Sequence, residues 1–137
     1  YAPPYGQAKD PVNQTGMVAH NVLTGELVLT GPEALTEDTP VLDVRTVGEY
    51  AAGHMPNSLN IPHTQLRDRL DEVQAWVDET VGDQPFVVMC AAGVRSWIGY
   101  RIVRHAGFTV TMLSGGIQTL RAWLGEKAEA VLVTGEG

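Results

Sequence analysis

Short apolar runs alternate with longer amphipathic stretches along the chain from Pro40 onward. Four of the runs predict buried strands, over residues 41–44, 58–61, 86–89 and 109–113. Four of the amphipathic stretches predict helices, over residues 46–52, 64–79, 96–105 and 116–124. Strands that alternate with helices are typical of an α/β domain. The sequence therefore predicts a central, mostly parallel sheet flanked by helices on both faces.

The first 40 residues follow a different pattern, rich in Pro, Gly, Thr and Asn, which is typical of turns and loops. Inside this stretch a helix is predicted from Asp10, as the N-cap, to a stop at Gly25, with Pro11 at its first position. A helix of about 13 residues is marginal alone, so we expect it to pack on the following domain or on a body outside the chain. The chain begins Tyr-Ala-Pro-Pro-Tyr, without an initiator Met or a secretory signal, and is expected to be an excised fragment.

Length and composition set the class of protein. A chain of 137 residues that is 44% hydrophobic and 18% charged has the size and composition of one globular domain. Its formal net charge of −7 and its two lysines argue against binding to nucleic acid or to an anionic membrane surface. The longest apolar run, over residues 86–94, is far shorter than the ~20 residues that span a bilayer, so no membrane partner is expected.

Charge is unevenly distributed along this acidic chain. Residues 26–89 hold twelve acidic and three basic side chains, whereas residues 90–125 hold four arginines and no acidic residue. The electropositive third begins at Cys90, the single cysteine. A lone cysteine excludes an internal disulfide and suits a reducing compartment, so a cytoplasmic location is expected.

The sequence around Cys90 predicts a nucleophile in an anion-binding loop. A buried strand over residues 86–89 leads into a loop from Cys90 to Arg95, and a helix is predicted to open at Ser96. Open α/β sheets bind ligands where a strand ends and a helix begins, because unpaired N–H groups and the helix dipole favour an anion there. The same environment favours the thiolate form of a cysteine. Nucleophilic attack by Cys90 on an anionic or sulfur-bearing substrate is the predicted chemistry.

The other loop residues fit the same function. Small side chains at Ala91, Ala92 and Gly93 let successive N–H groups point inward, and Arg95 adds a positive charge with a planar fork. Ser96 is predicted to be the N-cap of the following helix, with substrate contact as a second role. Besides the catalytic Cys90, the predicted substrate-binding residues are Ala91, Ala92, Gly93, Val94, Arg95 and Ser96.

Loop length favours sulfur transfer over phosphate hydrolysis. A cysteine-dependent phosphatase loop has five residues between Cys and Arg, whereas four separate Cys90 from Arg95 here. Thiol exchange also needs no strong general acid, and the loop offers none. A cysteine phosphatase and a non-catalytic binding or regulatory module stay as alternatives. Asp43 and Arg45 are expected to form a structural ion pair or turn anchor, and no histidine shares metal-ligand spacing with Cys90.

Several ordered motifs resemble those of rhodanese-like domains. They are Asp43-Val-Arg45, the stretch from Glu49 to Pro62, the Cys-x-x-Gly-x-Arg-Ser loop at Cys90, Gly107-Phe108, Leu113-Ser-Gly-Gly-Ile117 and Trp123. The match spans about residues 26–130, and we place the domain at residues 26–137. The resemblance implies a sulfurtransferase whose cysteine carries a persulfide between a sulfane-sulfur donor and a thiol acceptor. Ala91 and Ala92 depart from the charged or polar residues of the best thiosulfate-using members, which disfavours thiosulfate as the donor.

Residues 1–25 are similar to the end of the dimerisation domain in coenzyme A-disulfide reductases and NADH-dependent persulfide reductases, some of which carry a fused rhodanese domain. The resemblance implies that these residues are the remnant of such a domain in a larger, homodimeric flavoprotein. FAD, NAD(P)H and coenzyme A are then expected in the parent protein. No Gly-x-Gly-x-x-Gly motif occurs in the chain, so no cofactor is expected here. The implied sulfur donors are thiosulfate, polysulfide or a coenzyme A persulfide.

Overall fold

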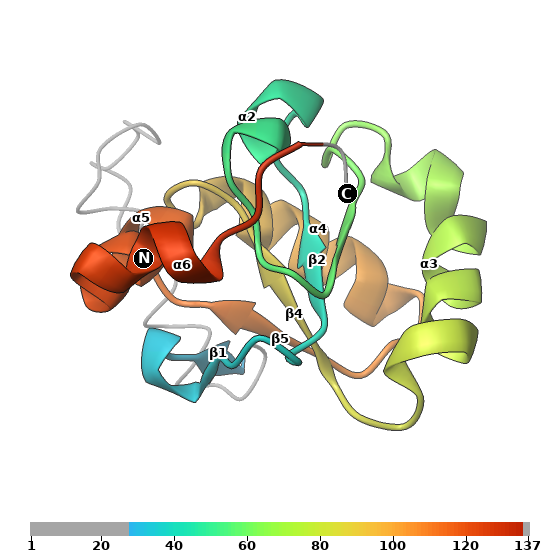
Figure 1. Ribbon diagram of the computed structural model, residues 1–137. Helices are drawn as coiled ribbons and strands as arrows, with labels where there is room; N and C mark the ends of the chain where they lie inside the picture. The colour runs from blue at the N-terminus through green and yellow to red at the C-terminus, as the bar shows by residue number, and fades with distance from the viewer. Residues whose placement is uncertain (1–27, 136–137) are drawn as a thin grey trace, which may run out of the picture.

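The computed structural model describes residues 28–135, which form a five-stranded sheet with helices on both faces (Figure 1). The strands are β1 (Leu29–Thr30), β2 (Val41–Asp43), β3 (Ser58–Asn60), β4 (Phe86–Met89) and β5 (Val110–Leu113). The α-helices are α2 (Val47–Ala52), α3 (Leu70–Trp76), α4 (Val94–His105), α5 (Gly116–Leu124) and α6 (Ala128–Val131). Shorter helical turns are η2 (Pro32–Ala34), η3 (Leu66–Arg69), η4 (Val77–Val81) and η5 (Gly125–Lys127). The helix predicted over residues 10–25 and the proposed reductase remnant lie outside the described residues.

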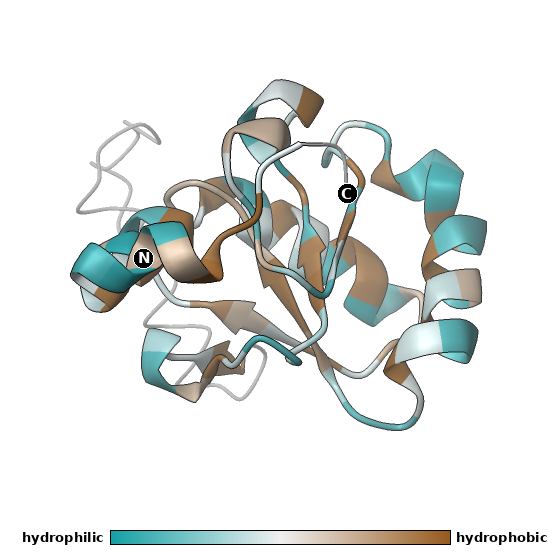
Figure 2. Ribbon diagram, in the orientation of Figure 1, coloured by the Kyte–Doolittle hydropathy of each residue, from teal (hydrophilic) through white to brown (hydrophobic). Residues whose placement is uncertain are grey.

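All strand pairs are parallel, in the order β1-β5-β4-β2-β3. Alternate side chains of the central strands enter two separate apolar cores. One core contains Leu42 and Val88 and is covered by α3 and α4. The other contains Val41 and Val87 and is covered by α5 and the segment that follows it. The apolar character of β2, β4 and β5 in Figure 2 follows from this burial on both faces.

The predicted fold class is confirmed, and most predicted elements lie within one or two residues of the observed ones. The stretch predicted as one helix over residues 64–79 instead winds as the 3₁₀ turn η3, the helix α3 and the π turn η4. Strand β1 was not predicted, because its two residues gain strand character only by pairing with β5. No helix in residues 28–135 is long and apolar enough to cross a membrane.

The topology brings two connections together at the carboxyl edge of the sheet. Strands β2 and β4 are neighbours, but β2 leads through α2 to β3 on one side, whereas β4 leads through α4 to β5 on the other. Adjacent parallel strands whose connections leave in opposite directions create a crevice where α/β proteins bind ligands. The residue after β4 is Cys90, so the fold places the predicted nucleophile in this crevice.

Candidate active site

Cys90 is a buried free thiol at the end of β4, with 1% of its surface exposed. The loop folds back over the sulfur, because the backbone N–H of Gly93 donates a hydrogen bond to Cys90 Sγ at 3.0 Å. Gly93 has a φ of 111°, in the left-handed region that favours glycine. The loop therefore holds at least one backbone donor against the sulfur, as predicted from its small residues.

Helix α5 fixes the orientation of the peptide groups in this loop. The N–H of Ile117 donates to the carbonyl of Cys90 at 2.7 Å, and the N–H of Gln118 donates to the carbonyl of Ala91 at 3.0 Å. The carbonyl and N–H of a trans peptide point in opposite directions. Since both carbonyls face α5, the N–H groups of Ala91 and Ala92 face away from α5.

Gly116 makes this arrangement possible. Its φ is 66°, and a Cβ there would lie 2.5 Å from the carbonyl oxygens of both Cys90 and Ala91. Only glycine lets the start of α5 approach the loop so closely. Two helices thus contact the Cys90 loop. The N–H groups of α5 bind the loop carbonyls, and α4 begins where the loop ends.

The start of α4 differs from the prediction. The helix begins at Val94 with Gly93 as its cap residue, so Ser96 is not the N-cap but a residue of the first turn. The prediction was wrong because the left-handed Gly93 starts the helix without a side-chain cap. Val94 is 44% exposed and Ala92 is also exposed, whereas Ala91 and Arg95 are half-buried.

Ser96 is fully buried, and its Oγ is the one buried side-chain polar atom without a hydrogen-bond partner among residues 28–135. A buried hydroxyl without a hydrogen-bond partner is costly in a folded protein. Ser96 carries this unpaired hydroxyl in the first turn of α4, directly after the Cys90 loop.

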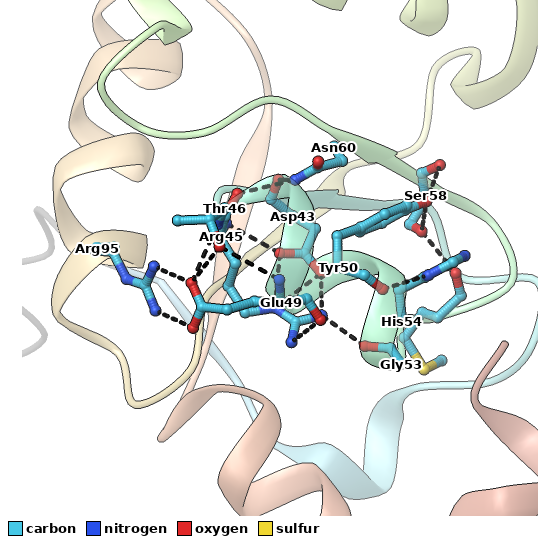
Figure 3. Close-up of polar contacts among 11 residues, drawn as sticks. Asp43, Arg45, Thr46, Glu49, Tyr50, Gly53, His54, Ser58, Asn60 and Arg95 are labelled. Atoms are coloured by element: carbon cyan, nitrogen blue, oxygen red, sulfur yellow. Dashed lines mark hydrogen bonds and ion pairs between the residues drawn. The ribbon is translucent and has the colours of Figure 1, made fainter. Parts of the chain in front are cut away.

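Arg95, predicted to bind substrate, forms a two-pronged ion pair with Glu49 of α2 (Figure 3). Arg95 Nη1 lies 2.5 Å from Glu49 Oε1, and Arg95 Nη2 lies 2.8 Å from Glu49 Oε2. This ion pair, here called the loop ion pair, links α2, which follows β2, to the start of α4, which follows the Cys90 loop. It spans the crevice between the two connections.

Glu49 is itself held in place. It forms a capping box with Thr46, whose backbone N–H and Oγ1 both lie within 3.1 Å of Glu49 Oε1. The hydrogen bonds from Arg95 lower the pKa of Glu49 to about 2, with smaller contributions from Thr46. The same hydrogen bonds raise the pKa of Arg95. Both groups are therefore charged at neutral pH, and the guanidinium charge is matched by a carboxylate.

A second ion pair, here called the buried ion pair, joins Asp43 and Arg45 at the end of β2 (Figure 3). Arg45 Nη2 lies 2.7 Å from Asp43 Oδ2, and the two side chains are 5% and 0% exposed. Arg45 also donates to the carbonyls of Glu49 at 3.1 Å and Gly53 at 2.7 Å. The predicted structural role of Asp43 and Arg45 is confirmed, and Arg45 positions the helix that carries Glu49.

His54 also has a structural environment. It is 1% exposed, its Nδ1 donates to the carbonyl of Tyr50 at 2.8 Å, and the two rings stack at 3.7 Å (Figure 3). Its backbone pairs with Val133, which ties the end of the described chain to α2. Within residues 28–135 no three His, Cys, Asp or Glu side chains gather as a metal site.

Sequence reasoning missed two residues of the site, Glu49 and Gly116. The spacing of Thr46 and Glu49 carries the signature of a capping box, which identifies a helix start but not an arginine partner 46 residues away. The pair of glycines at 115 and 116 signals a turn, but its contact with the Cys90 loop depends on β4 and β5 being neighbours.

The fold and the loop define an α/β domain with a cysteine at the crevice between β2 and β4. Comparison with protein families gives this class a name, since the model of the Rhodanese-like domain matches residues 32–122. The chain belongs to the rhodanese-like domain family, as the resemblance of its motifs implied.

Two solved structures are similar over most of the chain. Reduced Bacillus anthracis CoADR-RHD superposes with a TM-score of 0.74 at 32% identity, covering 92% of this chain and 22% of that one. A NAD-dependent persulfide reductase from A. fulgidus superposes with a TM-score of 0.67 at 38% identity, covering 87% of this chain and 21% of that one. In both, the similar part is about a fifth of a longer chain.

Curated relatives share a shorter stretch. The HTH-type transcriptional regulator Rv0324 of Mycobacterium tuberculosis is 37% identical over 82 residues, 58% of this chain and 33% of that protein. The tRNA uridine(34) hydroxylase of Pectobacterium carotovorum subsp. carotovorum is 33% identical over 81 residues, 58% of this chain and 22% of that protein. The chain thus spans a third or less of the length of these relatives.

Proposed function

We propose that this domain is a sulfurtransferase in which Cys90 takes a sulfane sulfur from a donor and passes it to a thiol acceptor. The observation that supports this most is the loop around Cys90. Its sulfur already accepts a hydrogen bond from Gly93, and the N–H groups of Ala91 and Ala92 are turned away from α5. A persulfide on Cys90 would place its outer sulfur among these donors.

The reaction has two balanced steps. The Cys90 thiolate attacks the sulfane sulfur of the donor, an S–S bond forms to Sγ, and the donor's own S–S bond breaks with the electron pair leaving on the donor. A thiolate acceptor then attacks the outer sulfur, the new S–S bond breaks, and Cys90 leaves as a thiolate. Both leaving groups are weak bases, which fits a loop without a general acid.

A cysteine phosphatase is the weaker alternative. Four residues separate Cys90 from Arg95, and the arginine that would bind a phosphoryl group is already paired with Glu49. A non-catalytic binding module is a second alternative. The enclosed thiol and the oriented amides favour chemistry over binding alone.

The proposal extends to the neighbours of the domain. We propose that it works beside a flavin-dependent coenzyme A-disulfide or persulfide reductase of the same polypeptide, a homodimer that would bring FAD, NAD(P)H and coenzyme A. Two findings support this: the motif resemblance of residues 1–25, and the likeness to two longer chains that include a persulfide reductase. Polysulfide or a coenzyme A persulfide would then be the donor. A reducing compartment, the cytoplasm, is part of the proposal because Cys90 must be kept as a thiol.

Intact-protein mass spectrometry tests the proposed reaction. The reduced protein is exposed in turn to thiosulfate, polysulfide and coenzyme A persulfide, beside Cys90→Ser as the control. We expect a gain of one sulfur atom that cyanide or a thiol removes and that the Cys90→Ser variant does not show. No gain from any donor, with Cys90 still open to alkylation, would support the binding module instead.

A further inference from the structure

The charge of the Cys90 loop depends on a residue outside the loop. Arg95 is the one cationic side chain between Cys90 and Ser96, and it is paired through both nitrogens with Glu49. Because Glu49 is ionised at neutral pH, the loop presents oriented amides but little net positive side-chain charge. In this loop the charge of the arginine is balanced by a carboxylate, whereas an unpaired arginine could bind an anion directly.

We propose that Glu49 is a specificity-determining residue, which neutralises Arg95 and so makes the loop select organic hydropersulfides over oxyanionic sulfur donors. The inference rests on the proposed function, because it concerns the donor of the same transfer. It acts through electrostatics, since Glu49 bonds to Arg95 and not to the reacting sulfur.

The charges of the two candidate reactions differ greatly. With a protonated organic hydropersulfide, the Cys90 thiolate attacks the outer sulfur of R–S–SH, giving Cys90–S–SH and RS⁻, with one negative charge before and after. With thiosulfate, the thiolate attacks the outer sulfur of a dianion, giving Cys90–S–S⁻ and sulfite, with three negative charges before and after. Like charges within a few ångströms repel strongly in a half-buried site. The second reaction therefore needs a free cation, and the first does not.

The geometry makes this neutralisation a stable feature of the site. Glu49 is held by the capping box with Thr46, and its backbone carbonyl accepts from the buried Arg45. The ion pair is nevertheless within reach of a donor, since the Arg95 and Glu49 side chains are 26% and 37% exposed. Glu49 is therefore positioned by α2, and the ion pair is accessible to a donor.

A comparison of two donors tests the proposal. Rates of Cys90 persulfide formation are measured by intact mass with thiosulfate and with 2-hydroxyethyl hydropersulfide, whose organic part is uncharged. In Glu49→Gln the freed Arg95 charge is expected to raise the thiosulfate rate relative to the hydropersulfide rate roughly tenfold. In Glu49→Asp, which keeps the charge, the ratio is expected to stay near that of the unaltered protein.

Glu72→Gln is the matched control. Glu72 forms an exposed ion pair with Arg69 at 2.6 Å, and its replacement changes the net charge of the protein by the same amount. In Glu72→Gln the ratio of the thiosulfate rate to the hydropersulfide rate should not change. A Glu49→Gln ratio that equals the Glu72→Gln ratio overturns the role of Glu49, while hydropersulfide uptake would still uphold the transfer itself. Absence of uptake from both donors in the unaltered protein refutes the transfer and with it this inference.

Discussion

Two ion pairs lie at the carboxyl edge of the sheet, and they differ in nearly every physical respect. The buried ion pair joins residues two apart in sequence, and its Asp43 side chain is fully enclosed. The loop ion pair joins residues 46 apart, and both side chains are partly open to solvent. The Arg45 side chain also bonds to two backbone carbonyls, whereas the Arg95 side chain bonds to Glu49 through both of its Nη atoms.

The two ion pairs therefore have different roles. The buried ion pair supports the site, and the loop ion pair can be changed at a smaller cost in stability. A buried pair is costly to break, because one partner is left as an uncompensated charge away from water. A partly exposed pair is cheap to break, because water replaces the lost partner. The buried ion pair therefore fixes where α2 lies, and the loop ion pair sets the charge that a donor meets.

The largest effect is expected from breaking the buried ion pair. Asp43→Asn leaves Arg45 charged and enclosed, and should lower the free energy of unfolding by about 3 kcal/mol. Urea denaturation followed by circular dichroism measures the change. Glu72→Gln, in an exposed pair, should change it by less than about 0.5 kcal/mol. Equal losses in the two variants would contradict the distinction between buried and exposed pairs.

The next largest effect concerns the contact between α5 and the Cys90 loop. Gly116→Ala introduces a Cβ 2.5 Å from two carbonyl oxygens at a φ of 66°, and should cost about 2 kcal/mol and slow sulfur uptake. Thermal unfolding and uptake rates are measured together. Gly48→Ala is the control, because nothing lies within 4 Å of the new Cβ in a helix, and it should stabilise by about 0.5 kcal/mol. Normal uptake by Gly116→Ala would show that the contact with α5 does not shape the loop.

Breaking the loop ion pair should have a smaller, pH-dependent effect. The pKa of Glu49 falls from 4.5 to about 2 on folding, so its contribution to stability is present above pH 4.5 and is lost as the pH falls towards 2. Solvent screening of this partly exposed pair limits the contribution to about 1 kcal/mol. Denaturation at pH 7 and at pH 2 should show Glu49→Gln less stable than the unaltered protein at pH 7 and equal to it at pH 2. If the two proteins differ in stability by the same amount at pH 7 and at pH 2, the difference does not come from the ionisation of Glu49.

The smallest expected effect on stability has the opposite sign. Ser96→Ala removes a buried hydroxyl without a partner, and should raise the free energy of unfolding by up to about 1 kcal/mol. If the Ser96 hydroxyl hydrogen-bonds to the sulfur carried by Cys90, the rate of sulfur uptake should fall at the same time. Chemical denaturation and single-turnover mass measurements check both. A loss of stability would mean that Ser96 has a partner in the folded protein.

The fold could be predicted closely because its elements are local in sequence. The apolar run at β4 and the glycine-bounded α5 lie at the predicted positions. The start of α4 was predicted two residues late, because serine is a preferred N-cap whereas a left-handed glycine such as Gly93 more often marks a helix end. The pairing of Arg95 with Glu49 could not be predicted from the sequence, because α2 and α4 come together only when β2 and β4 pair in the sheet.

The most direct test of the account is a crystal structure of the protein with a persulfide on Cys90. The account predicts an outer sulfur within hydrogen-bond distance of the N–H groups of the Ala91–Gly93 loop, with Arg95 still paired to Glu49. It would be contradicted by an outer sulfur that points into solvent without a loop donor, or by an Arg95 that has left Glu49 to bind the sulfur.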